Sequence, residues 1–183
     1  MGTARQVQLL GALILTLALS ACGFQLRGAD SMPDALAPLS LSCSDNVPGS
    51  LCGDVRDQLR LYGLLAGENE TPAYRLELSD YNQDRRASAI SDRAAAAEYE
   101  LDASVALALN TVDDIPLLAQ TRLSSRETYR ADETEVLAGE REQQSVEDIV
   151  RNRLAQQVVR RLSPFTEQRI ERIRAEHKTE SSE

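Results

Sequence analysis

The chain has 183 residues, a formal net charge of −9 and no tryptophan. An acidic chain of this composition is not suited to non-specific binding of DNA or anionic lipid, so nucleic acid is not an expected partner. Residues 1–21 carry one charge, on Arg5, so the remaining 162 residues have a net charge of −10 (−9 minus +1) and suggest one domain with an aliphatic core.

The first 21 residues have the pattern of an export signal. The apolar run 9–19 follows Arg5 and has 11 residues, whereas a membrane-spanning helix needs about 20. The run leads into Leu19-Ser20-Ala21-Cys22, the order of a bacterial lipobox, whose chemistry joins a diacylglycerol to the cysteine sulfur. We therefore predict a signal peptide over residues 1–21 and a mature chain that begins at an acylated Cys22. The alternative is a buried or disulfide-bonded Cys22 behind an ordinary signal peptide.

The predicted anchor is a covalent diacylglycerol and an N-acyl chain on Cys22, and no other cofactor is expected. Two or more acyl chains hold a protein stably at a membrane, whereas one chain does so only marginally. In Gram-negative lipoproteins, an aspartate after the lipidated cysteine commonly marks retention in the inner membrane. Gly23 stands there instead and favours the outer membrane. Residues 22–34 lack apolar periodicity and are predicted to form a lipidated tether.

Cys43 and Cys52 are the other two cysteines of the chain. In the oxidising compartment of an exported protein they could pair, and the short loop would add roughly 2.5–3 kcal/mol to the unfolding free energy on the chain-entropy model. The alternative is two unrelated reduced thiols. A metal site is less favoured because no histidine lies nearby, and none is predicted.

The first predicted elements are a strand over residues 36–42 and a helix over residues 51–62. Pro38 argues for an edge position or a late start of the strand. Ser50 is a suitable N-cap for the helix and Gly63 a suitable C′ residue. The helix is predicted from apolar residues that share one face: Leu51, Val55, Leu59 and Tyr62.

Three further strands are predicted from alternating apolar residues. The first of these strands begins at Tyr74, the second covers residues 98–109 and the third covers residues 117–129. The alternation is cleanest in the second strand. The short links between them predict an antiparallel meander. A linker over residues 84–93 is expected between the first two of these strands.

A second helix is predicted to end near Leu162, before Pro164. A start near residue 141 is favoured, and the alternative is a capping box that begins at Ser145. Residues 164–183 hold the single histidine, His177, and little apolar content, so we expect a polar, disordered tail. The helix is predicted from residues that recur every four positions: Val146, Val150, Leu154 and Val158.

The resulting order β-α-β-β-β-α predicts an α+β fold for a domain over residues 35–163. A sheet with one apolar face needs a covering layer, and the two amphipathic helices supply it. The expected architecture is therefore a two-layer sandwich, in which both helices cover one face of a four-stranded mixed sheet.

The sequence offers no catalytic constellation. It lacks a G-x-S-x-G elbow, a G-x-G-x-x-G loop, a phosphate loop and an H-E-x-x-H motif, and His177 lies in the predicted tail. Three arginines, Arg85, Arg86 and Arg93, cluster in the predicted linker instead. Because the guanidinium fork suits phosphate, this cluster could meet an anionic headgroup. The alternative is a solvated hairpin tip.

Four stretches of the chain are distinctive by their order and spacing. They are CGFQLR at 22–27, VRDQLRLYG at 55–63, AEYEL at 97–101 and the segment 136–162, which ends in QVVRRL. No single stretch is decisive, but together they resemble the LptE family of lipopolysaccharide-assembly lipoproteins from Gram-negative bacteria.

The resemblance implies a non-enzymatic periplasmic domain that lies as a plug inside the lumen of an LptD-type outer-membrane β-barrel. The one-to-one complex would deliver lipopolysaccharide to the outer leaflet, and the lipoprotein would assist barrel assembly. Basic residues of the family contact lipopolysaccharide, and the nearest match to one such position here is Arg93. A second position corresponds to Gly139, with Arg141 close by. The alternative is an unrelated periplasmic α+β lipoprotein that binds peptides or stabilises the envelope.

Overall fold

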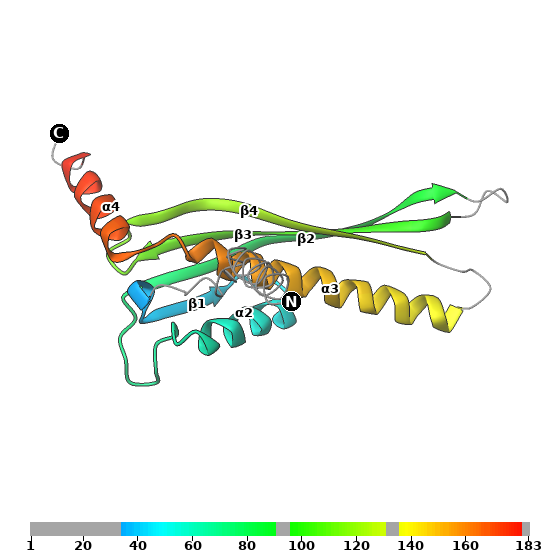
Figure 1. Cartoon of the computed structure of the whole chain (residues 1–183), viewed down its shortest axis with the longest axis horizontal. Helices are drawn as coiled ribbons and strands as arrows, with labels where there is room; N and C mark the ends of the chain where they lie inside the picture. The colour runs from blue at the N-terminus through cyan, green and yellow to red at the C-terminus, as the bar shows by residue number, and fades with distance from the viewer. Residues whose placement is uncertain (1–33, 91–95, 131–135, 181–183) are drawn as a thin grey trace, which may run out of the picture. The chain divides into compact units, whose positions relative to one another are not determined.

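The computed structural model describes residues 34–90, 96–130 and 136–180 of the chain (Figure 1). Cys22 and Arg93 lie outside these ranges, so their predicted roles stay predictions. The elements in chain order are η1 (Asp34–Leu36), β1 (Leu39–Cys43), α2 (Gly49–Leu61), β2 (Tyr74–Ile90), β3 (Ala96–Thr111), β4 (Pro116–Arg130), α3 (Val136–Leu162) and α4 (Glu167–Glu180).

The four strands form one mixed sheet in the order β1-β2-β3-β4. β1 runs parallel to β2, with Leu41 opposite Leu76. The pairs β2–β3 and β3–β4 are antiparallel, which confirms the predicted meander. The prediction of an α+β fold with a four-stranded mixed sheet is confirmed.

Helices α2 and α3 lie on the same side of the sheet, and their apolar stripes meet the alternating apolar residues of the strands (Figure 1). Burying a leucine or valine side chain contributes roughly 1.5–3 kcal/mol, so this aliphatic layer dominates the stability of the domain. The fully buried residues of the layer include Leu51, Val55 and Leu59 from α2, Leu76 from β2, Leu101, Val105, Leu107 and Leu109 from β3, and Val150, Leu154 and Val158 from α3.

The edge strand β1 begins late, as Pro38 predicted. The Ala37–Pro38 peptide bond is cis, and the strand starts at the next residue, Leu39. The Leu39 N–H donates to the Leu64 carbonyl (2.8 Å), and the Ala66 N–H donates to the Leu39 carbonyl (3.0 Å). Residues 64–66 therefore cover the outer edge of β1 at its first residue, which limits pairing with other chains there.

The ends of α2 match the prediction in part. Gly63 follows the helix with φ at +68°, and its N–H donates to the Arg60 carbonyl (3.0 Å), as expected of a C′ glycine. Ser50 is not the N-cap, because the helix begins one residue earlier at Gly49 and the capping position is held by Pro48.

The prediction of a linker over residues 84–93 was wrong for most of that range. β2 continues to Ile90 and has 17 residues, paired with β3 along almost all of its length. Residues 82–88 are exposed, so polar side chains occupy both faces of the strand there. A strand without a buried face shows no apolar alternation, and the pattern therefore ended before the strand did.

The disordered tail predicted for residues 164–183 was also wrong for its larger part. α4 covers Glu167–Glu180, while residues 181–183 lie outside the described ranges. Phe165 and Ile170 are buried, at 2% and 3% exposure, and hold the start of α4 against the core. α3 begins at Val136, before the expected residue 141, and ends at Leu162 as predicted. In the part of the chain that the structure describes, none of the helices is both long and apolar enough to cross a membrane.

Candidate functional site

The face of the sheet turned away from α2 and α3 is lined with charged side chains, and we call it the open face. On β3, Leu101 and Ala103 point into the core, so Glu100 and Asp102 point the other way. The basic residues of the open face are Arg75, Arg86, Arg122, Arg126 and Arg130, and the acidic residues are Glu77, Asp84, Glu98, Glu100 and Asp102.

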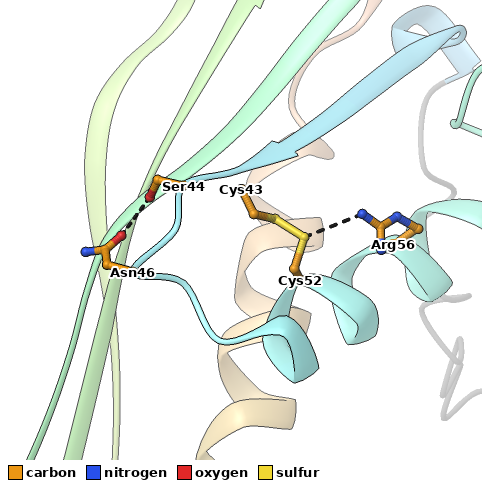
Figure 2. The surroundings of a disulfide bond; sticks show 5 residues. All are labelled: Cys43, Ser44, Asn46, Cys52 and Arg56. Carbon is orange, nitrogen blue, oxygen red and sulfur yellow. Dashed lines mark hydrogen bonds between the residues drawn. A yellow bond between two sulfur atoms is a disulfide. The ribbon is translucent and has the colours of Figure 1, made fainter.

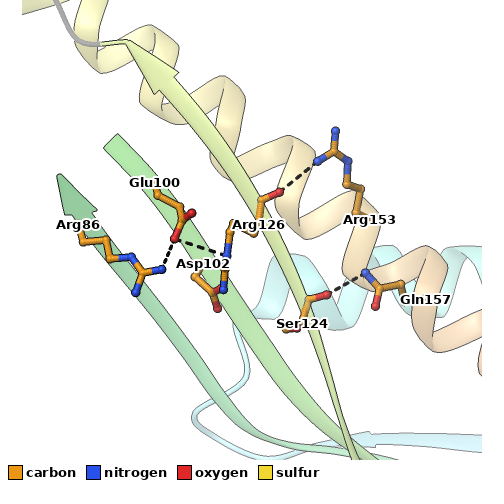
Figure 3. Close-up of polar contacts among 7 residues, drawn as sticks. All are labelled: Arg86, Glu100, Asp102, Ser124, Arg126, Arg153 and Gln157. Atoms are coloured by element: carbon orange, nitrogen blue, oxygen red, sulfur yellow. Dashed lines mark hydrogen bonds and ion pairs between the residues drawn. The ribbon is translucent and has the colours of Figure 1, made fainter. Parts of the chain in front are cut away.

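Ion pairs between neighbouring strands connect these charges (Figure 3). Arg126 Nη2 lies 2.8 Å from Asp102 Oδ2, and Arg126 Nε lies 3.4 Å from Glu100 Oε1. Arg86 on β2 contacts the same carboxylate of Glu100, whose side chain is only 14% exposed between the two guanidinium groups. The hydrogen bond to Asp102 and the charge of Glu100 raise the pKa of Arg126, so this side chain stays protonated. The result is a strongly polar surface of nearly balanced charge.

Arg85 lies on the opposite face of the sheet from Arg86, since successive residues of a strand alternate. Its guanidinium carbon lies 4.7 Å from the centroid of the Tyr99 ring. Arg85 Nη1 donates to Gln143 Oε1 (2.6 Å) on α3 and to Tyr129 Oη (3.3 Å) on β4. Tyr99 and Tyr129 stack with their centroids 5.8 Å apart. We call these four residues the Arg85 cluster; it joins β2, β3, β4 and α3.

The predicted arginine group is therefore divided. Arg86 belongs to the open face, Arg85 to the helix side, and Arg141 is exposed on α3. Sequence reasoning missed Tyr129 and Gln143 as partners of Arg85. They lie 44 and 58 residues further along the chain, and only the tertiary fold brings them together.

Side chains of α3 also bind the free edge of β4 (Figure 3). Gln157 Nε2 donates to the Ser124 carbonyl (3.0 Å), and Arg153 Nη1 donates to the Arg126 carbonyl (3.3 Å) while its guanidinium pairs with Glu127. An edge strand otherwise presents such carbonyls to other chains. α3 therefore fixes β4 and at the same time reduces its tendency to pair elsewhere.

Cys43 and Cys52 form a disulfide, the arrangement that the sequence left open (Figure 2). It joins the end of β1 to the first turns of α2, with the Cα atoms 6.3 Å apart. Within the described ranges, no group of three or more His, Cys, Asp or Glu side chains is placed to hold a metal ion.

A family model and a curated relative point to the same family. A family model described as LptE, lipopolysaccharide-assembly, matches residues 36–162. The LPS-assembly lipoprotein LptE of Yersinia enterocolitica is 34% identical over 159 residues, which cover 84% of this chain and 73% of the relative.

Solved structures share the fold. The crystal structure of rare lipoprotein B from Shewanella oneidensis matches with a TM-score of 0.58 and 25% identity, over 69% of this chain and 94% of that one. The solution structure of lipoprotein B from Nitrosomonas europaea matches with a TM-score of 0.63 and 17% identity, over 77% and 90% of the two chains. The matched family region ends before α4, so this helix lies beyond it.

Proposed function

The chain belongs to the LptE family of lipopolysaccharide-assembly lipoproteins, and from this premise we propose that it fills and helps to assemble an LptD-type β-barrel of the outer membrane. In this role it is not an enzyme. It forms a one-to-one complex with the barrel, and the complex delivers lipopolysaccharide to the outer leaflet.

The open face is the observation that carries the plug role. The interior wall of a large outer-membrane barrel is polar, so a domain enclosed by it needs a polar surface. Arg126, Glu100 and Asp102 give the open face such a surface, with charges that are paired within the domain. The three strands that form this face have 15 to 17 residues, against a usual strand length of about five or six. Their length suits an elongated lumen.

In this proposal, lipopolysaccharide is bound by arginines near the C-terminal end of β2 and the N-terminal end of α3. Arg85 is the strongest described candidate, because the groups that contact it, Tyr99, Tyr129 and Gln143, are neutral. The charge of Glu147 also acts on Arg85, but more weakly than its contact with Tyr129. The charge of Arg85 is available to a phosphate group, and its orientation is already fixed. Arg86 shares its charge with Glu100, so it contributes less. Arg141 and Arg93 complete the proposed set. Arg93 lies outside the described ranges, so its place in the set rests on the sequence.

The proposed anchor is the acylated Cys22, which holds the domain at the outer membrane through the predicted tether of residues 22–34. Gly23 after the cysteine supports a location at the outer membrane rather than the inner membrane. The domain then lies on the periplasmic side and enters the barrel from there.

A photo-crosslinking amino acid introduced in living cells tests the proposed docking. Thr128 is exposed on β4, on the open face, and Arg172 is exposed on α4, beyond the matched family region. We expect a crosslinker at Thr128 to capture one large β-barrel protein, and one at Arg172 to capture far less of it. Failure of Thr128 to capture a barrel, with normal protein levels, would contradict the proposed contact.

A further inference from the structure

The two sulfurs of the Cys43–Cys52 disulfide have different surroundings (Figure 2). Cys52 is buried at 8% exposure, in the first turns of α2, and its N–H donates to the Pro48 carbonyl (3.1 Å). Cys43 is half-buried at the end of the edge strand β1. Cys43 is therefore the more exposed residue of the two.

Positive charge lies beside the Cys52 sulfur. Arg56 follows one turn later on α2, and its Nη2 lies 3.6 Å from Cys52 Sγ. The start of a helix adds a partial positive charge, and both effects stabilise a thiolate. Neither acid of α2 competes for Arg56. Asp54 binds Arg151 at 2.8 Å, and Asp57, the residue after Arg56, does not face it on the helix. Arg56 is therefore left to act on the Cys52 sulfur.

We propose that Cys43 is the exchange-reactive sulfur of this disulfide and that Cys52 is its leaving group. The thiolate of a thiol reductant attacks Cys43 Sγ and forms a new S–S bond with it. The Cys43–Cys52 bond breaks, and its electron pair leaves on Cys52 as a thiolate held by Arg56. Thiol–disulfide exchange is faster when the leaving thiolate is stabilised and the attacked sulfur is accessible. The reductant sulfur is oxidised in this step, and Cys52 is reduced.

The fold around the disulfide favours rapid re-closure. The loop between the cysteines is held by hydrogen bonds from the Ser44 N–H to the Leu78 carbonyl (2.9 Å) and from the Val47 N–H to the Ser44 carbonyl (2.9 Å). Val47 is buried, and α2 stays packed through Leu51, Val55 and Leu59. The two sulfurs therefore remain close after exchange, and the Cys52 thiolate attacks the mixed disulfide on Cys43 and expels the reductant. This inference concerns the domain itself and does not rest on the proposed barrel role.

Glutathione labelling of the oxidised, folded protein tests the direction of exchange. The protein is exposed briefly to excess reduced glutathione, quenched with acid and blocked with N-ethylmaleimide, and its peptides are then mapped by mass spectrometry. We expect glutathione on Cys43 and maleimide on Cys52, with a preference of about tenfold or more over the reverse pattern. Protein unfolded in urea is the control and should lose the preference. Equal labelling of the folded protein, or glutathione mainly on Cys52, would overturn the proposal.

The role of Arg56 is tested by a matched pair of variants on α2. Both Arg56 and Arg60 are exposed, so Arg56→Gln and Arg60→Gln should both leave the domain folded, which circular dichroism can verify. We expect Arg56→Gln to slow the first step of reduction about threefold, because the Cys52 thiolate loses its cation. Arg60→Gln should not change the rate. Equal rates of reduction for the two variants would show that Arg56 does not stabilise the Cys52 thiolate as a leaving group.

Discussion

Arg85 and Arg86 are adjacent in the chain but act on opposite faces of the sheet. Arg86 pairs with Glu100 on the open face, whereas Arg85 donates to Gln143 of α3 on the helix side. One arginine is thus neutralised by an acid, and the other is held by neutral partners. This difference decides which of them can offer its charge to an anionic ligand.

We predict unequal effects of Arg85→Gln and Arg86→Gln on lipopolysaccharide binding. Loss of a hydrogen bond to a charged group costs about 1.5–3 kcal/mol, so Arg85→Gln should weaken binding roughly 10- to 100-fold. Arg86→Gln should change binding by less than about threefold, because Glu100 already compensates the charge of Arg86. Titration with fluorescent lipopolysaccharide measures both. Equal losses would contradict the assignment of the site to Arg85.

Core packing is tested by two substitutions on α3. Leu154 is fully buried, so Leu154→Ala should lower the free energy of unfolding by about 2–5 kcal/mol. Ile149 on the same helix is 39% exposed, so Ile149→Ala should cost less than about 1.5 kcal/mol. Urea denaturation followed by circular dichroism gives both values. Similar costs for the two variants would contradict the placement of α3.

Alanine substitutions at Gly53, within α2, and at Gly63, at its C′ position, should change the stability of the domain in opposite directions. Gly63 has φ at +68°, where a side chain costs about 1–2 kcal/mol, so Gly63→Ala should destabilise the domain even though the site has room for a methyl group. Gly53 lies within the helix, and a Cβ added there would have no atom of another element within 4 Å, so Gly53→Ala should stabilise the domain by about 0.8–1.0 kcal/mol. Thermal unfolding of both variants checks the sign, and a stabilising Gly63→Ala would be inconsistent with the helix end described here.

The lipid anchor predicts a specific mature N-terminus. Mass spectrometry of the protein from native membranes should find Cys22 as the first residue, with the mass of a diacylglycerol and an N-acyl chain. A Cys22→Ala variant should lose this modification and leave the membrane fraction. An unmodified N-terminus at another residue would refute the lipobox interpretation.

The fold was predictable where one face of an element is buried. Alternation from Tyr99 to Leu109 predicted β3, and the four-residue recurrence from Val146 to Val158 predicted the packed part of α3. The same rule failed where burial is sparse. β2 extends through exposed residues 82–88, and α4 is anchored by little more than Phe165 and Ile170.

The candidate site was predictable only by residue type. The sequence identified the arginines, but the face on which each one lies depends on the register of β2 and β3. The neutral partners of Arg85 come from β3, β4 and α3, so no local pattern connects them. The disulfide was easier to predict, because Cys43 and Cys52 are only nine residues apart and one turn of the chain brings them together.

The stoichiometry of the native complex tests the proposed function most directly. The protein, tagged at its C-terminus and expressed from its own locus, is purified from outer membranes in mild detergent and weighed by native mass spectrometry. We predict one copy of this lipoprotein with one copy of a large β-barrel protein. Recovery of the lipoprotein as a free monomer at its native level, with the barrel absent, would contradict the plug role.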